Sequence, residues 1–189
     1  IARATRKLAQ RAARNNVPVV NVWFNSPAAK SLPSVFADWS TIGRLRVEHL
    51  LTRGFRRFAV LTCRGDRSHI LERDAFVSRL DELGYPCIVR ATSLDATESL
   101  AQWRKNERTI TAWMEELKPP IGVFVGADDE GRMVAQMCRN RGLRVPEDVA
   151  IITGDNEETF CERLRPTLSS VEVGFERIGY EAAGMLHRL

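Results

Sequence analysis

Short apolar segments rich in β-branched residues alternate with amphipathic segments along most of the chain. Three of them have the pattern of strands buried on both faces: FAVLTC at 58–63, IGVFVGA at 121–127 and VAIIT at 149–153. Segments of helical periodicity lie beside them, at 72–84, 108–117 and 129–142. Strand, helix and strand at this spacing predict an α/β fold with parallel sheets and right-handed crossovers.

Further elements are predicted on both sides of this core. A helix over 40–54 begins at Ser40 and ends at Gly54, a residue suited to the left-handed position after a helix. Helical patterns are also present at 1–16 and 175–189. Short strands are expected at 17–24, 86–91 and 168–173, and a loop carrying Trp103 is expected at 92–105.

Composition places the chain among ordinary globular proteins, because 44% of its 189 residues are hydrophobic. No segment approaches the roughly 20 apolar residues that a membrane span needs, so no membrane partner is expected. The four cysteines are scattered at Cys63, Cys87, Cys138 and Cys161, with no CxxC pair. Metal binding and a disulfide framework are therefore disfavoured, and a reducing compartment is expected.

The net charge of +4 comes from one end of the chain. Residues 1–16 hold five basic residues and no acidic residue, whereas the remainder holds 23 basic and 24 acidic residues. Arg3, Lys7, Arg11 and Arg14 share one helix face, opposite the small apolar residues. A solvated helix face explains this pattern better than a stripe that binds DNA, and no helix-turn-helix pattern is present.

Polar residues follow three apolar segments of the chain. Asp38 ends PSVFAD, Asp128 and Asp129 follow IGVFVGA, and Asp155 and Asn156 follow VAIITG. Helix capping is one explanation for Asp155 and Asn156 taken alone. Arg73 also follows a strand, and the carboxyl ends of parallel strands meet at the edge where α/β folds bind ligands. Together these residues favour a ligand site over capping.

The residue types indicate what such a site binds. Carboxylates and amides form paired hydrogen bonds with adjacent hydroxyls, and an arginine donates to oxygens, so a neutral polyol is expected. Candidate aromatic walls are Trp23, Phe24, Trp39 and Trp103, each of which also fits simple core packing. A phosphate ligand is disfavoured because no GxxxxGK loop is present. A metal-dependent phosphotransfer enzyme is the competing enzyme hypothesis.

Several segments resemble the lactose-repressor family of transcription regulators. The resembling segments are DWSTIGRLRVEHLLTRGFRRFAVL, RDAF, GADDEG, GLRVPEDVAIITGDNEE and RPTLSSVEVGFERIGYEAAGML. They occur in the family's order over essentially the whole chain. GDNEETFCERL and ADDEGR are most similar to the xylose-responsive members. Ala75 stands in the arginine motif where the family usually has Gly, and Asp128 stands where many members have Asn.

The resemblance implies a periplasmic-binding-protein-like fold of type I, with two Rossmann-like lobes joined by crossover strands. Residues 1–54 and 171–189 are expected to form an incomplete N-terminal lobe, and 55–170 the C-terminal lobe, with the chain a fragment of a longer protein. The family's ligand residues correspond to Asp38, Arg73, Asp128 and Asp155. With Asn156, Trp39 and Trp103, these form the predicted ligand site.

The implied function is that of a cytoplasmic, dimeric sugar sensor without a cofactor. A monosaccharide, xylose or a related pentose or hexose, is expected to close the two lobes and so control DNA binding through a domain outside this chain. The alternative is the extracytoplasmic sugar-binding protein of a transporter, which shares the fold. A non-enzymatic role is expected in both cases.

Overall fold

The computed structural model describes residues 4–93 and 99–189. The chain forms two compact units. Unit 1 contains Ile1–Asp38 and Val173–Leu189, and unit 2 contains Trp39–Glu172.

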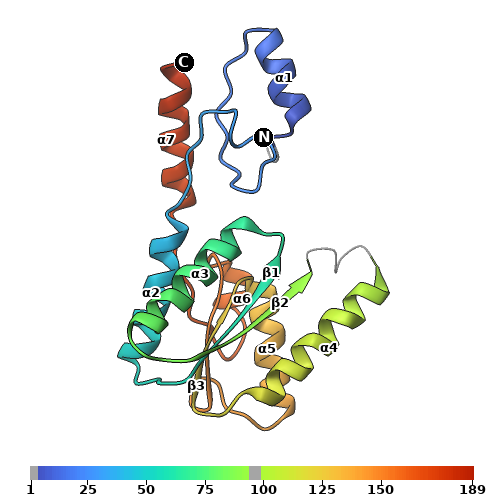
Figure 1. The fold of residues 1–189 in the computed structure, drawn as a ribbon, viewed down its shortest axis with the longest axis vertical. Coiled ribbons are helices and arrows are strands. Elements are labelled where there is room, and N and C mark those ends of the chain that lie inside the picture. The colour runs from blue at the N-terminus through green and yellow to red at the C-terminus, as the bar shows by residue number, and fades with distance from the viewer. Residues whose placement is uncertain (1–3, 94–98) are drawn as a thin grey trace. The chain divides into compact units, whose positions relative to one another are not determined.

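Unit 2 is built on a four-stranded parallel sheet in the order β2-β1-β3-β4 (Figure 1). The strands are β1 (Phe58–Arg64), β2 (Cys87–Ser93), β3 (Ile121–Val125) and β4 (Val149–Ile152). β1 pairs with β2 and with β3, and β3 pairs with β4, all in parallel. The predicted α/β fold with a parallel sheet is confirmed.

Helices cover both faces of this sheet, as the strongly buried strands β1, β3 and β4 require. They are α2 (Trp39–Thr52), α3 (Arg67–Glu82), α4 (Leu100–Glu116), α5 (Asp128–Asn140) and the short α6 (Glu158–Cys161). Alternate residues of β1 face opposite layers: Leu61 packs in a cluster with residues of α4 and α5, and Val60 in a cluster with residues of α2 and α3. The two clusters sandwich the sheet.

Two of the predicted helices differ at their starts. α3 begins at Arg67, earlier than expected, because the side chain of Asp66 caps it by accepting hydrogen bonds from the backbone N–H groups of Ser68 and His69. α4 begins at Leu100, inside the expected loop 92–105. Ser99 caps it, and the part of that loop at 94–98 lies outside the described residues.

Unit 1 contains α1 (Arg6–Arg14) and α7 (Phe175–His187). The predicted strand at 17–24 is wrong for the structure described: it contributes one isolated bridge, between Asn21 and Ser34. The predicted strand at 168–173 likewise contributes one bridge, between Ile152 and Ser169 in unit 2. Both segments have strand-like residues, but no continuous ladder pairs with them in the described part of the chain.

The units divide at a different place from the expected lobes. The expected N-terminal lobe included α2, but α2 packs closely against α3, so it belongs to unit 2. Gly43 permits this packing, because a Cβ there would clash with the backbone of Glu72. Within the described ranges, no helix is long and apolar enough to cross a membrane.

Candidate ligand site at the carboxyl edge of the sheet

Asp128 joins the ends of two neighbouring strands. It follows β3 as the first residue of α5, and its residue surface is 8% exposed. Its Oδ2 accepts hydrogen bonds from the backbone N–H groups of Glu157, at 2.8 Å, and Asp155, at 3.3 Å. Its Oδ1 is buried and has no hydrogen-bond partner among the described residues. Asp128 therefore holds the loop after β4 through Oδ2.

Asp155 lies on this loop and is exposed at the surface. Its pKa is raised to about 6, mainly by desolvation, while Arg46 opposes the shift and Asp128 and Asp66 add to it. A carboxyl group surrounded in this way is a marker of functional sites in α/β folds. The structure thus brings two predicted site residues, Asp128 and Asp155, to one edge of the sheet.

Asn156 follows with a left-handed backbone, at φ 65°. Its Nδ2 donates to Oε2 of Glu172 at 3.3 Å, and its Oδ1 accepts from the hydroxyl of Ser170 at 2.6 Å. The capping explanation is not supported for either Asp155 or Asn156, because the N-cap of α6 is Glu157. The side-chain amide of Asn156 instead joins this loop to the segment that contains Ser170 and Glu172.

Arg46 and Glu72 form a buried ion pair beside this edge, which the sequence did not reveal as part of the site. Arg46 is 0% exposed and Glu72 is 1% exposed. Nε and Nη2 of Arg46 donate to Oε2 of Glu72 at 3.0 and 2.6 Å. The guanidinium also donates to the carbonyl oxygens of Thr153 and Gly154, and it lies 4.4 Å from the ring centroid of Phe124.

The position of Arg46 in the sequence indicated that its side chain is buried. Arg46 lies between Ile42 and Leu50 at intervals of four residues, so it occupies the apolar stripe of α2. A charged residue in such a stripe needs a buried partner. Burial raises the pKa of Glu72 to about 7 even though Arg46 opposes the shift.

His69 also lies at this edge, in the first turn of α3. Its Nδ1 accepts from the backbone N–H of Cys63 at 3.4 Å. A Cβ on Gly126 would lie 2.9 Å from the same nitrogen, so the absence of a side chain at Gly126 makes room for the ring. Burial lowers the pKa of His69, which favours the neutral imidazole.

The other predicted site residues come from α3, from the starts of α2 and α4, and from unit 1. Arg73 is on α3, where its Nε and Nη2 donate to Oδ1 of the adjacent Asp74 at 2.9 and 2.6 Å. Trp39 is the half-buried first residue of α2, and Trp103 is 48% exposed in the first turn of α4. Asp38 is an exposed residue of unit 1.

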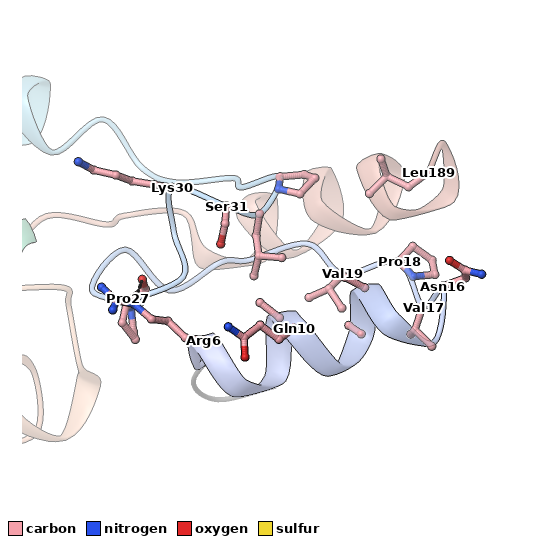
Figure 2. A pocket seen from close by; sticks show the side chains of 15 residues that line it. Arg6, Gln10, Asn16, Val17, Pro18, Val19, Pro27, Lys30, Ser31 and Leu189 are labelled. Atoms are coloured by element: carbon pink, nitrogen blue, oxygen red, sulfur yellow. Dashed lines mark hydrogen bonds between the residues drawn. The ribbon is translucent and has the colours of Figure 1, made fainter.

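A separate cavity of about 890 Å³ lies within unit 1. Figure 2 shows it beside α1, with Arg6, Val19 and Lys30 among the side chains around it. Its wall is mainly apolar and carries basic side chains but no carboxylate, so it lacks the acceptors that a polyol site needs. The sheet edge of unit 2 has those acceptors and is the stronger candidate. No group of three or more His, Cys, Asp or Glu placed to hold a metal is found in the described ranges.

Ligands of α/β proteins bind at the carboxyl edge of a parallel sheet covered on both faces, and unit 2 has polar groups at this edge. Residues 47–189 match the family of periplasmic binding protein-like domains, and the chain belongs to this family. The resemblance stated from the sequence is confirmed.

Relatives include the xylose operon regulatory protein of Escherichia coli K12, which is 30% identical over 190 residues, covering 97% of this chain and 48% of that protein. The xylose operon regulatory protein of Haemophilus influenzae is 30% identical over 161 residues, covering 83% of this chain and 41% of that protein. A solved structure of a xylose-binding transcription activator is 28% identical, has a TM-score of 0.76, and is matched over 97% of this chain and 49% of its own. The chain thus spans about half the length of these relatives.

Proposed function

We propose that this chain is the effector-binding part of a sugar-responsive transcription regulator of the lactose-repressor type, and that its effector is a monosaccharide, with xylose as the first candidate. Relatives over most of the chain are named as regulators of a xylose operon. Those names favour a regulator over the sugar-binding subunit of a transporter, and over an enzyme.

The observation that carries the proposal is the arrangement at the carboxyl edge of unit 2. Asp128 presents a buried oxygen without a hydrogen-bond partner among the described residues, and Asp155 presents an exposed carboxylate beside it. Both groups accept hydrogen bonds, and a sugar supplies adjacent hydroxyl donors. An effector at this edge satisfies the unused oxygen of Asp128, which otherwise costs free energy.

The regulatory part of the proposal follows from the family. Effector binding favours one of two conformational states through contacts that the other state lacks, and lobe closure is the state change expected for this family. DNA is read by a domain outside this chain, the regulator acts as a homodimer, and it works in the cytoplasm. The chain catalyses no reaction.

Ligand-dependent stabilisation tests the proposal. Thermal unfolding is measured with D-xylose, other pentoses and hexoses, because a ligand at 100 times its Kd stabilises the folded state by about 2.7 kcal/mol. A shift with one sugar or a few related sugars supports the proposal. If no pentose or hexose raises the unfolding temperature at millimolar concentration, the proposed function is wrong.

A further inference from the structure

Arg46 occupies a place in unit 2 where four elements meet. It projects from α2, pairs with Glu72 of α3, lies over Phe124 of β3, and binds the backbone that follows β4. None of these contacts involves a solvent-exposed partner group, because Glu72, Phe124, Thr153 and Gly154 are all buried. A guanidinium supplies its donors in a rigid planar fork, so it fixes several acceptors at once.

The backbone acceptors of Arg46 are the two residues before Asp155. The guanidinium donates to the carbonyl oxygen of Thr153, and Nη2 donates to that of Gly154 at 3.1 Å. From the other side, Asp128 accepts from the N–H groups of Asp155 and Glu157. Arg46 therefore holds the carbonyl groups of this loop, and Asp128 holds its backbone N–H groups.

The backbone of this loop is also closely packed at Gly154. A Cβ on Gly154 would lie 2.8 Å from the carbonyl oxygen of Gly126 and 3.2 Å from Oδ1 of Asp128. The backbone at Gly154 therefore packs closely against the residue that follows β3, and Arg46 contacts the same loop from α2.

We propose that Arg46 is a positioning residue for the effector site: by binding the carbonyl groups of Thr153 and Gly154, it sets where the Asp155 carboxylate is presented. This inference rests on the proposed function for the identity of the ligand. The placement of the loop by Arg46 does not depend on that identity. Glu72 has a secondary role, because it neutralises and orients the guanidinium.

The electrostatic surroundings of Asp155 give the proposal a second readout. Arg46 faces it from α2, Glu72 from α3, Asp66 from the loop before α3, and Asp128 from the start of α5. Arg46 is the only one of these four that favours the ionised carboxylate. Loss of Arg46 therefore raises the pKa of Asp155, whereas Arg46→Lys keeps the charge and separates this electrostatic effect from the placement of the loop.

Removal of Arg46 alone strands a buried carboxylate, so the main variant replaces both partners, as Arg46→Met with Glu72→Met. Replacement of a buried ion pair by apolar residues of similar volume is often tolerated. The matched control is Arg44→Met with Glu82→Met, which removes an exposed ion pair between the same two helices. Arg46→Lys is a second test variant that keeps the charge but loses the planar fork. Circular dichroism and thermal unfolding of each full chain establish that it is folded.

Three quantities are measured on these chains: sugar affinity by calorimetry, amide exchange at Asp155 and Glu157, and titration of the Asp155 carboxyl by carbon-detected NMR. In the double variant we expect the amide-exchange rates of the loop and the dissociation constant of the sugar to rise about tenfold or more. The titration of the Asp155 carboxyl should move to higher pH. In Arg46→Lys, we expect the amide-exchange rates and the dissociation constant of the sugar to rise, while the Asp155 carboxyl titrates near the pH found in the wild type. The control pair, Arg44→Met with Glu82→Met, is expected to stay within about twofold of the wild type in affinity.

Two results overturn the inference. In one, a folded double variant matches the control pair in amide exchange and in the titration of Asp155. In the other, the loop loosens but sugar affinity stays that of the wild type. If the wild type itself binds no pentose or hexose, the proposed function fails. The amide-exchange rates and the titration of Asp155 still decide whether Arg46 places the loop.

Discussion

The side chain of Asp128 accepts a 2.8 Å hydrogen bond from the backbone N–H of Glu157, so the start of α5 is joined directly to the loop after β4. The two residues are far apart in the sequence, and the parallel pairing of β3 with β4 brings them together. This bond uses one carboxylate oxygen and leaves Oδ1 unpartnered among the described residues. Asp128 thus has one oxygen that holds the loop and one that we propose accepts a hydrogen bond from the effector.

Substitution of Asp128 is expected to separate these two roles. Asp128→Ala removes the acceptor of two backbone N–H groups and is expected to lower the free energy of unfolding by about 1–3 kcal/mol. Asp128→Asn keeps one carbonyl acceptor and is expected to cost less. Chemical denaturation measures both, with the exposed neighbour Asp129→Asn as control. Equal stability of Asp128→Ala and the control would contradict the loop-holding role.

Glu72 is expected to make stability depend on pH. Its pKa is raised from 4.5 to about 7, so between these values the folded chain keeps a proton that the unfolded chain has lost. The contribution of Glu72 to the free energy of unfolding is therefore present at low pH and falls as pH rises through this window, by at most about 3 kcal/mol.

Denaturation of the wild type and Glu72→Gln from pH 4 to 8 measures this contribution as the difference between the two chains. The stability of the wild type relative to Glu72→Gln should decrease as pH rises. A constant difference would show that Glu72 titrates normally in the folded chain.

Arg73 offers a test of the site residues inferred from the family resemblance. Its ion pair with Asp74 is on the surface, since the Asp74 side chain is 58% exposed, and such pairs contribute about 1 kcal/mol or less. Arg73→Ala should therefore change stability little. If Arg73 binds the sugar, its loss should cost about 2–4 kcal/mol of binding free energy. Calorimetry measures the sugar affinity of Arg73→Ala, with Asp74→Asn as the control. Unchanged affinity in Arg73→Ala would show that Arg73 only forms the surface ion pair.

The central sheet was predictable from the sequence because its strands are buried on both faces. β3 and β4 are fully apolar runs and β1 begins with one, and the polar residues that follow β3 and β4 indicated the edge that holds Asp128 and Asp155. Residues 17–24 have the same β-branched composition and form only a bridge. Composition reports a preference for extended backbone, but a strand also needs a neighbour with which to pair.

The ion pair of Arg46 and Glu72 was not predictable in the same way. Each residue belongs to a different helix, and their contact depends on how closely α2 approaches α3 at Gly43. Spacing within one helix shows that Arg46 faces inward, but it does not identify the partner. Such a pair is a property of the tertiary packing.

The most direct test of the account is calorimetric titration of D-xylose and a panel of pentoses and hexoses into the wild type and Asp155→Ala. Desolvation by the neighbouring groups has raised the pKa of Asp155, so its ionised form is disfavoured by folding, and Asp155→Ala should keep the unfolding temperature of the wild type or raise it. Exposed Glu162→Ala is the matched control. We expect saturable binding of a monosaccharide by the wild type and the control, and an affinity at least about tenfold weaker in Asp155→Ala. Binding of equal strength in Asp155→Ala, or no binding of any of these sugars by the folded wild type, would contradict the account.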